Sequence, residues 1–155
     1  MSSSLTAHLK WNKKMHFTGT CGSHTLSIDT NSEHGGEDLG PTPKQLVLQA
    51  MMACSAMDIV SILEKMRQPI LGFEMNIEAE KNTHPPIYFK SSRLKYFLSG
   101  DIQPDKAIKA LDSSLTKYCG VNYMISKAGK IFFELYLNDK LIHSGPVEFH
   151  EPLAD

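Results

Sequence analysis

Residues 40–67 read GPTPKQLVLQAMMACSAMDIVSILEKMR, and this stretch decides the fold. Thr42 and Pro43 are typical of a helix start, because the threonine hydroxyl caps free N–H groups and proline has no N–H to satisfy. The residues that follow are strong helix formers and are apolar on almost every face until the charged segment 64–67. We therefore predict a long central helix from Pro43 to about Arg67, buried along most of its length.

The sequence on both sides of this helix alternates polar and apolar residues, as strands with one buried face do. Because most links between these strands are too short for parallel crossovers, we predict an α+β fold in which antiparallel sheets surround the central helix. A chain of 155 residues suits one core, so we expect a single domain over residues 1–155. The predicted elements are two or three strands within 5–28, a loop over 32–43, a hairpin of 73–81 and 87–99, a helix from 101–104 to about 119, a short helix at 121–125, and a strand pair of 130–137 and 141–149.

Charge and leader signals limit the choice of partners and compartment. The 16 basic and 17 acidic residues are interleaved, so no positive field attracts nucleic acid or anionic lipid. The first residues lack the basic start and apolar run of an export signal, and Gln49, Ser55 and Asp58 interrupt the most apolar stretch, which argues against a membrane span. An odd number of cysteines suits a reducing compartment, and we predict a cytoplasmic protein without nucleic-acid or membrane partners.

The three cysteines are the candidate reactive groups. Cys54 lies in the middle of the predicted central helix, where a cysteine is most often a small buried hydrophobe. Cys119 precedes Gly120 at a predicted helix start, where free N–H groups favour thiolate, although packing at a helix corner is the plainer explanation. Cys21, in a turn between strands, is taken as incidental. No CxxC pair and no helical His spacing with glutamate occurs, so we predict no metal and no cofactor.

Four segments together resemble the OsmC/Ohr family, and the closest resemblance is to its OsmC-like branch. The resemblance covers nearly the whole chain and is carried by Gly35-Gly36, Gly40-Pro-Thr-Pro-Lys-Gln-Leu46, Ala50-Met-Met-Ala-Cys-Ser-Ala-Met-Asp-Ile-Val-Ser-Ile-Leu63 and Tyr118-Cys-Gly-Val-Asn-Tyr123. It implies an intertwined homodimer with two sites at the dimer interface. It also implies that Cys54 attacks a peroxide and that Cys119 resolves the resulting sulfenic acid to a disulfide, which a dithiol then reduces.

The chain departs from the active members of that family at two places. Those members use an arginine from the N-terminal strands, oriented by a glutamate directly after the helix-entry proline, whereas Lys44 follows Pro43 here and no arginine precedes Arg67. Lys44 lies about 15 Å of helix rise from Cys54, too far for direct contact within one chain. Other groups that we expect near the site are Asp58, whose charge would raise the pKa of a neighbouring thiol, His24, His34 and Glu37 at the pocket rim, and Met51, Met52 and Met57 in its lining.

Two functions follow from these residues. The first is a thiol-dependent organic hydroperoxide reductase in oxidative-stress defence that uses Cys54 and Cys119. The alternative is a catalytically degenerate dimer that binds a small hydrophobic ligand in a methionine-rich interface pocket. A third hypothesis is a purely structural dimer. Because all three hypotheses predict a dimer, dimerisation alone does not distinguish between them.

Overall fold

The structure is a computed structural model that describes residues 4–151. The chain divides between Gln49 and Ala50, inside its longest helix, into two compact units, which are described separately below. The prediction of a single domain over residues 1–155 stays a prediction.

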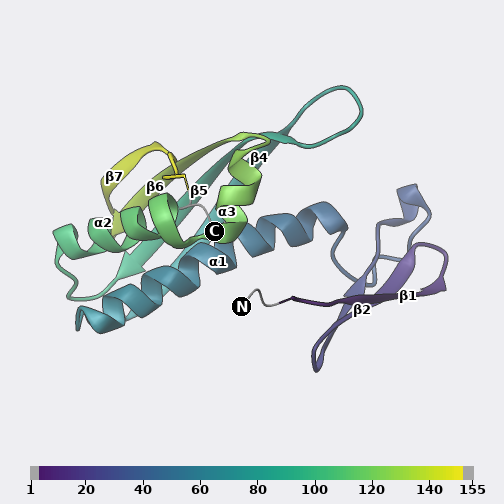
Figure 1. Ribbon diagram of the computed structural model, residues 1–155, viewed down its shortest axis with the longest axis horizontal. Helices are drawn as coiled ribbons and strands as arrows, with labels where there is room; N and C mark the ends of the chain where they lie inside the picture. Colours follow the sequence, from purple (N-terminus) through teal and green to yellow (C-terminus); the bar gives the residue numbers. More distant parts are fainter. Residues whose placement is uncertain (1–3, 152–155) are drawn as a thin grey trace. The chain divides into compact units, whose positions relative to one another are not determined.

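The first unit contains a three-stranded antiparallel sheet in the order β1-β2-β3 (Figure 1). Its strands are β1 (His8–Lys13), β2 (His16–Cys21) and β3 (His24–Ile28). The register places Trp11 opposite Phe17 and Phe17 opposite Ile28, so one face of this sheet carries apolar side chains. Trp11 is 61% exposed on that face. The prediction of two or three antiparallel strands is confirmed.

The loop after β3 is ordered by a buried carboxylate. Asp29 accepts hydrogen bonds from the backbone N–H groups of Thr30, Glu37 and Leu39 at 2.8, 3.1 and 3.2 Å. Although burial alone would raise the pKa of Asp29, these donors hold it below its ordinary value. Gly36 packs so closely against the Thr30 carbonyl that a Cβ could not fit. The predicted loop is confirmed, and it contains one short 3₁₀ turn, η1 (Ser32–His34).

Helix α1 (Pro43–Lys65) begins where the sequence predicts and ends two residues earlier than predicted. A capping box fixes its start, because the Thr42 hydroxyl accepts from the Gln45 N–H at 3.4 Å while the Gln45 side chain accepts from the Thr42 N–H at 2.8 Å. Burial differs from the prediction, since only 22% of the most apolar window of α1 is buried in the single chain. The buried residues recur once per turn, at Met51, Ser55, Ile59 and Leu63.

Length and composition alone would allow α1 to cross a membrane. Its polar side chains argue against lipid on the face that they occupy, because Ser55 and Asp58 both hydrogen-bond to protein side chains. The expectation that the chain has no membrane partner is retained as a prediction.

The second unit is a four-stranded sheet, in the order β4-β5-β6-β7, with helices on one face (Figure 1). The hairpin of β4 and β5 is antiparallel as predicted, and β6 and β7 are joined by a turn at Asn138 and Asp139, both at positive φ. The pair β5–β6 is parallel, which corrects the expectation of antiparallel pairing throughout. The elements are β4 (Gly72–Lys81), β5 (Phe89–Ser99), α2 (Pro104–Ser113), the π-helical turn η2 (Ser114–Tyr118), α3 (Gly120–Ser126), β6 (Lys130–Leu137) and β7 (Lys140–Pro146).

The parallel pair requires a crossover connection, and α2, η2 and α3 supply it. The inner face of the sheet is apolar, and Leu94, Tyr96 and Leu135 on it are fully buried. On the helical side, Ile59 of α1 and Leu111 of α2 are also fully buried. This core fixes the crossover next to α1, and the α+β class predicted from the sequence is confirmed.

Candidate functional site

The second unit brings Cys54, Asp58 and Cys119 together. The two sulfur atoms and a carboxylate oxygen of Asp58 all lie within 4.8 Å of one another. Cys54 and Asp58 share a face of α1 because they are one helical turn apart. Cys119 comes from the crossover, at the junction between η2 and α3. The residues that the sequence singles out as a thiol pair are therefore neighbours in space.

The two thiols differ in exposure. Cys54 is half-buried, whereas Cys119 is 1% exposed. Burial raises the pKa of the Cys119 thiol to about 12, against the opposing effect of hydrogen bonds from Asn122, and the neighbouring Cys54 raises it further. The expectation that the helix start lowers this pKa is therefore wrong.

Asn122 and Ser114 hold the two sides of the cluster. The Asn122 side-chain amide donates from Nδ2 to Cys119 Sγ at 3.1 Å and to the Met51 carbonyl at 3.0 Å. The Ser114 hydroxyl donates to Asp58 Oδ2 at 2.9 Å. Both side chains are fully buried, so they position the thiol and the carboxylate with little freedom to move.

A second buried hydrogen bond ties α1 to the sheet beneath the cluster. The Tyr96 hydroxyl of β5 donates to Ser55 Oγ at 3.0 Å, one residue after Cys54. Burial raises the pKa of Tyr96 well above its ordinary value, so the phenol stays protonated and keeps this bond at neutral pH. The position of Cys54 against β5 is fixed in this way.

A cavity of about 430 Å³ opens beside the cluster. Asp58 and Tyr118, the residue before Cys119, both line it. The predicted methionine lining stays a prediction, because Met51 is fully buried and Met57 is 72% exposed in the single chain. The remaining lining residues of this cavity are Ser61, Ile62, Lys65 and Met66.

Four other predicted site residues lie in the first unit. Lys44 is exposed in the first turn of α1. His24, which is exposed, lines an apolar groove of about 510 Å³ on the three-stranded sheet. The His34 ring is 2.7 Å from the Asn31 side chain, in η1.

Glu37, the fourth of these residues, carries two ion pairs. Lys13 and Lys14 lie 2.9 and 3.2 Å from its carboxylate oxygens. The hydrogen bonds from these lysines hold the pKa of Glu37 below its usual value. A role of Glu37 and His34 at the pocket rim stays a prediction.

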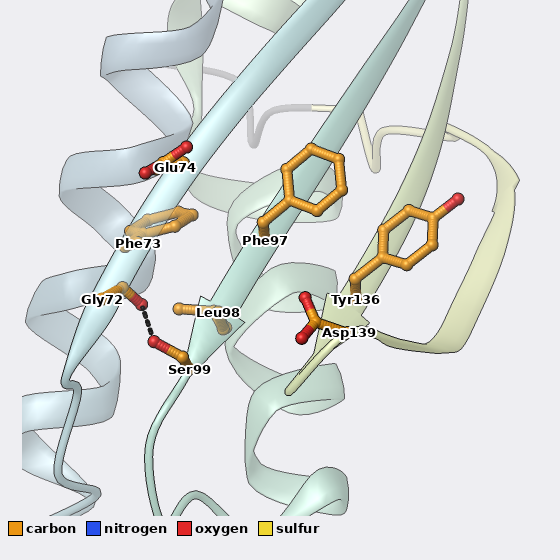
Figure 2. A pocket seen from close by; sticks show the side chains of 8 residues that line it. All are labelled: Gly72, Phe73, Glu74, Phe97, Leu98, Ser99, Tyr136 and Asp139. Atoms are coloured by element: carbon orange, nitrogen blue, oxygen red, sulfur yellow. Dashed lines mark hydrogen bonds between the residues drawn. The ribbon is translucent and has the colours of Figure 1, made fainter.

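A further groove, of about 290 Å³, lies on the strands of the second sheet (Figure 2). Phe97 stacks on Tyr136 there, with ring centroids 4.9 Å apart, and the groove is also lined by Glu74 and Asp139. It contains no thiol or histidine, so it lacks a nucleophile comparable with Cys54. We therefore place the candidate site at the cysteine cluster.

Sequence reasoning missed Ser114 and Asn122. Both are small polar residues in apolar surroundings, and Asn122 follows Cys119 at a spacing of one turn. That spacing is a usable signal in retrospect, because an amide one turn after a helix-start cysteine can reach its sulfur. Ser114 carries no comparable local signal, since its partner Asp58 is on another helix.

Both the sequence and the fold resemble those of known proteins. Residues 35–133 match the family model described as OsmC-like protein. Protein YhfA of Escherichia coli K12 is 36% identical over 129 residues, which cover 82% of this chain and 93% of YhfA.

Two solved structures share the fold. The OsmC-like protein of Mycoplasma pneumoniae superposes with a TM-score of 0.75 at 15% identity, covering 88% of this chain and 99% of that one. An organic hydroperoxide resistance protein OsmC of Legionella pneumophila superposes at 0.62 with 19% identity, covering 87% and 96%. The family match and the identity with YhfA together establish that this chain belongs to the OsmC-like family.

Proposed function

We propose that this protein is a thiol-dependent organic hydroperoxide reductase in which Cys54 is the peroxidatic and Cys119 the resolving cysteine. The single observation that carries the proposal is the proximity of the two sulfur atoms, within 4.8 Å, although the residues come from separate helices. The Legionella pneumophila protein of the same fold is an organic hydroperoxide resistance protein, which supports the same chemistry.

The difference in exposure supports the order of the two cysteines. The half-buried Cys54 can be reached by a peroxide, whereas Cys119 is 1% exposed and cannot be the first point of attack. The Cys54 thiolate attacks the terminal peroxide oxygen, the O–O bond breaks, and the alkoxide leaves as an alcohol after it takes a proton. Cys54 is then a sulfenic acid.

Cys119 completes the cycle by attacking the Cys54 sulfenic sulfur. A disulfide forms and the hydroxyl leaves as water, so two thiols and one peroxide give one disulfide, one alcohol and one water. Because burial raises the pKa of Cys119 to about 12, its proton has to be removed during this step. Asp58 is the nearby base, with a carboxylate oxygen within 4.8 Å of the sulfur. A dithiol then reduces the disulfide by exchange.

Exposed apolar surface supports a homodimer. Met57 on α1 is 72% exposed, and most of the apolar window of α1 is uncovered in the single chain. Surface of this kind usually marks a protein interface. A cytoplasmic homodimer that receives electrons from a dithiol completes the proposal.

The test is an anaerobic thiol titration of the reduced protein before and after one equivalent of cumene hydroperoxide, with peptide mapping. We expect two thiols to disappear and a Cys54–Cys119 disulfide to form. Cys119→Ser should instead accumulate Cys54 sulfenic acid, which a dimedone-type reagent labels. Cys21→Ser, which alters an exposed thiol outside the cluster, is the matched control and should behave as wild type. Survival of all three thiols in the wild-type protein would refute the proposal.

The second candidate is binding of a small hydrophobic ligand. The observation that favours it is the apolar groove on the three-stranded sheet, which Leu9, Leu26 and Ile28 line. If the groove binds ligands, an environment-sensitive apolar dye should bind to it saturably, and treatment with peroxide should not change that binding. Leu26→Asp should abolish that binding and should leave the thiol titration unaltered.

A further inference from the structure

The cysteine cluster is also a set of metal donors. Two cysteine sulfurs and one carboxylate oxygen lie within 4.8 Å of one another. We propose that reduced Cys54, Cys119 and Asp58 bind a zinc-class divalent cation, with the fourth coordination position left to water. This inference depends on the geometry of the cluster and not on the peroxide reaction.

The donor types fit such an ion. Zinc takes thiolate sulfur at about 2.3 Å and carboxylate oxygen at about 2.0–2.2 Å in a tetrahedron, which places two sulfur ligands about 3.8 Å apart. The donor atoms lie no more than 4.8 Å apart, which exceeds the sulfur separation that zinc requires by at most about 1 Å. Two soft thiolates select zinc, cadmium or cobalt over magnesium or calcium, which prefer oxygen ligands.

Ser114 and Asn122 hydrogen-bond to the donor groups of the cluster, as the residues around a metal site commonly do. Ser114 donates to Oδ2 of Asp58 and leaves Oδ1 available to the metal. Asn122 donates to the sulfur of Cys119, as amides next to coordinated thiolates do. Both side chains are fully buried and therefore hold the donors in place before a metal arrives.

Charge gives an independent reason for a cation. Among residues 4–151, no lysine, arginine or histidine forms an ion pair with Asp58. If both thiols ionised, three negative charges would lie within 4.8 Å of one another in a partly buried site. A divalent cation leaves a net charge of −1 and releases two thiol protons. Affinity should therefore rise with pH.

One of the three donors, Asp58, faces space that solvent can enter. The cavity of about 430 Å³ is lined by Asp58 and by Tyr118, which precedes Cys119. A three-ligand site with an accessible fourth position takes a water molecule or an exogenous ligand. Disulfide formation consumes both sulfur donors, so metal binding and the oxidised state exclude each other.

Cobalt titration of the reduced full-length protein tests the site. We expect one Co²⁺ per chain, with the thiolate charge-transfer band and intense d–d bands of tetrahedral cobalt, and displacement by one equivalent of Zn²⁺. Cys54→Ser, Cys119→Ser and Asp58→Asn should each weaken binding at least tenfold, whereas Cys21→Ser should not. Weak octahedral cobalt spectra from the wild-type protein, or full binding by both cysteine variants, would overturn the inference.

Two further measurements separate loss of the site from loss of the fold. Zn²⁺ should raise the melting temperature of the wild-type protein and of Cys21→Ser but not that of Cys54→Ser, in which a half-buried sulfur is replaced isosterically. Protein with a preformed disulfide should not bind cobalt until a dithiol reduces it. Cobalt binding without peroxide-dependent disulfide formation would support the metal site and refute the peroxidase proposal. Disulfide formation without cobalt binding would refute the metal site and support the peroxidase proposal.

Discussion

The side-chain amide of Asn122 lies 3.1 Å from the sulfur of Cys119 and 3.0 Å from the carbonyl of Met51. One Nδ2 group thus links the second cysteine to the helix turn that precedes the first one. The Oδ1 atom of the same side chain is buried and has no hydrogen-bond partner among residues 4–151. A buried oxygen without a hydrogen-bond partner destabilises the fold, and proteins retain such a group where its side chain has a positioning role.

Removal of this amide should lower the stability of the fold and slow the proposed attack of Cys119 on the Cys54 sulfenic acid. Asn122→Ala removes two buried hydrogen bonds, from Nδ2 to the Met51 carbonyl and to Cys119 Sγ, and we expect the free energy of unfolding to fall by about 1–3 kcal/mol. The rate of disulfide formation at Cys119 should fall as well. Urea denaturation and stopped-flow thiol loss measure the two effects. Asn76→Ala, at an exposed position of β4, is the control, and an equal loss in this variant would contradict the positioning role.

Ser114 and Ser113 offer a matched pair of substitutions. The Ser114 hydroxyl donates to Asp58, whereas the Ser113 hydroxyl donates to the carbonyl of Lys109 one turn earlier. Ser114→Ala should slow formation of the disulfide from the Cys54 sulfenic acid, because the proposed proton acceptor Asp58 loses the buried hydrogen bond that positions it near Cys119. Ser113→Ala should not slow it. Rapid-quench trapping of the sulfenic acid after peroxide addition reads this step directly.

The raised pKa of Cys119 gives stability a defined pH dependence. The ordinary pKa of a cysteine thiol is 9.0, and burial raises the pKa of Cys119 to about 12 in the folded protein, so the folded state holds the proton more tightly between these values. Its contribution to stability is complete below about pH 9 and is lost as the pH rises toward 12. The difference in unfolding free energy between the wild-type protein and Cys119→Ser should therefore shrink over this range. Urea titrations from pH 8 to pH 11 measure it, and a pH-independent difference would contradict the assignment.

Met57 tests the proposed association of two chains. A charge placed on this 72% exposed apolar position should oppose burial against a second copy, and we expect Met57→Glu to shift the protein toward monomers. Analytical ultracentrifugation over a range of concentrations measures the shift. Lys109→Glu, a charge change at an exposed position of α2, should leave the assembly unchanged.

The sequence predicts the elements well and their pairing less well. Thr42 and Pro43 give a local signal, and the capping box forms at the predicted place. The parallel pairing of β5 with β6 could not be deduced from link length, because the intervening segment is long enough for either topology until its two helices are placed. The burial of α1 was overestimated because an apolar sequence does not say whether its own chain or another covers it.

At the candidate site, too, the sequence identifies individual residues better than it predicts their surroundings. Cys54 and Cys119 were identified from motifs, and the resemblance to a family implied that they meet. The predicted direction of the pKa shift at Cys119 is wrong, because burial outweighs the hydrogen bonds that Asn122 gives to the sulfur at the helix start. Local spacing also gave no indication of the three metal-type donors, since they come from two segments of the chain.

The parallel pairing of β5 with β6 has a consequence for biosynthesis. Cys119 lies in the connection between these strands, so the crossover that carries it is anchored at both ends only after β6 has been synthesised and has docked on β5. Pairing of distant segments is slow compared with helix formation. A chain emerging from the ribosome therefore carries both cysteines before the crossover that positions Cys119 is closed, and the proposed thiol chemistry would begin only after that step.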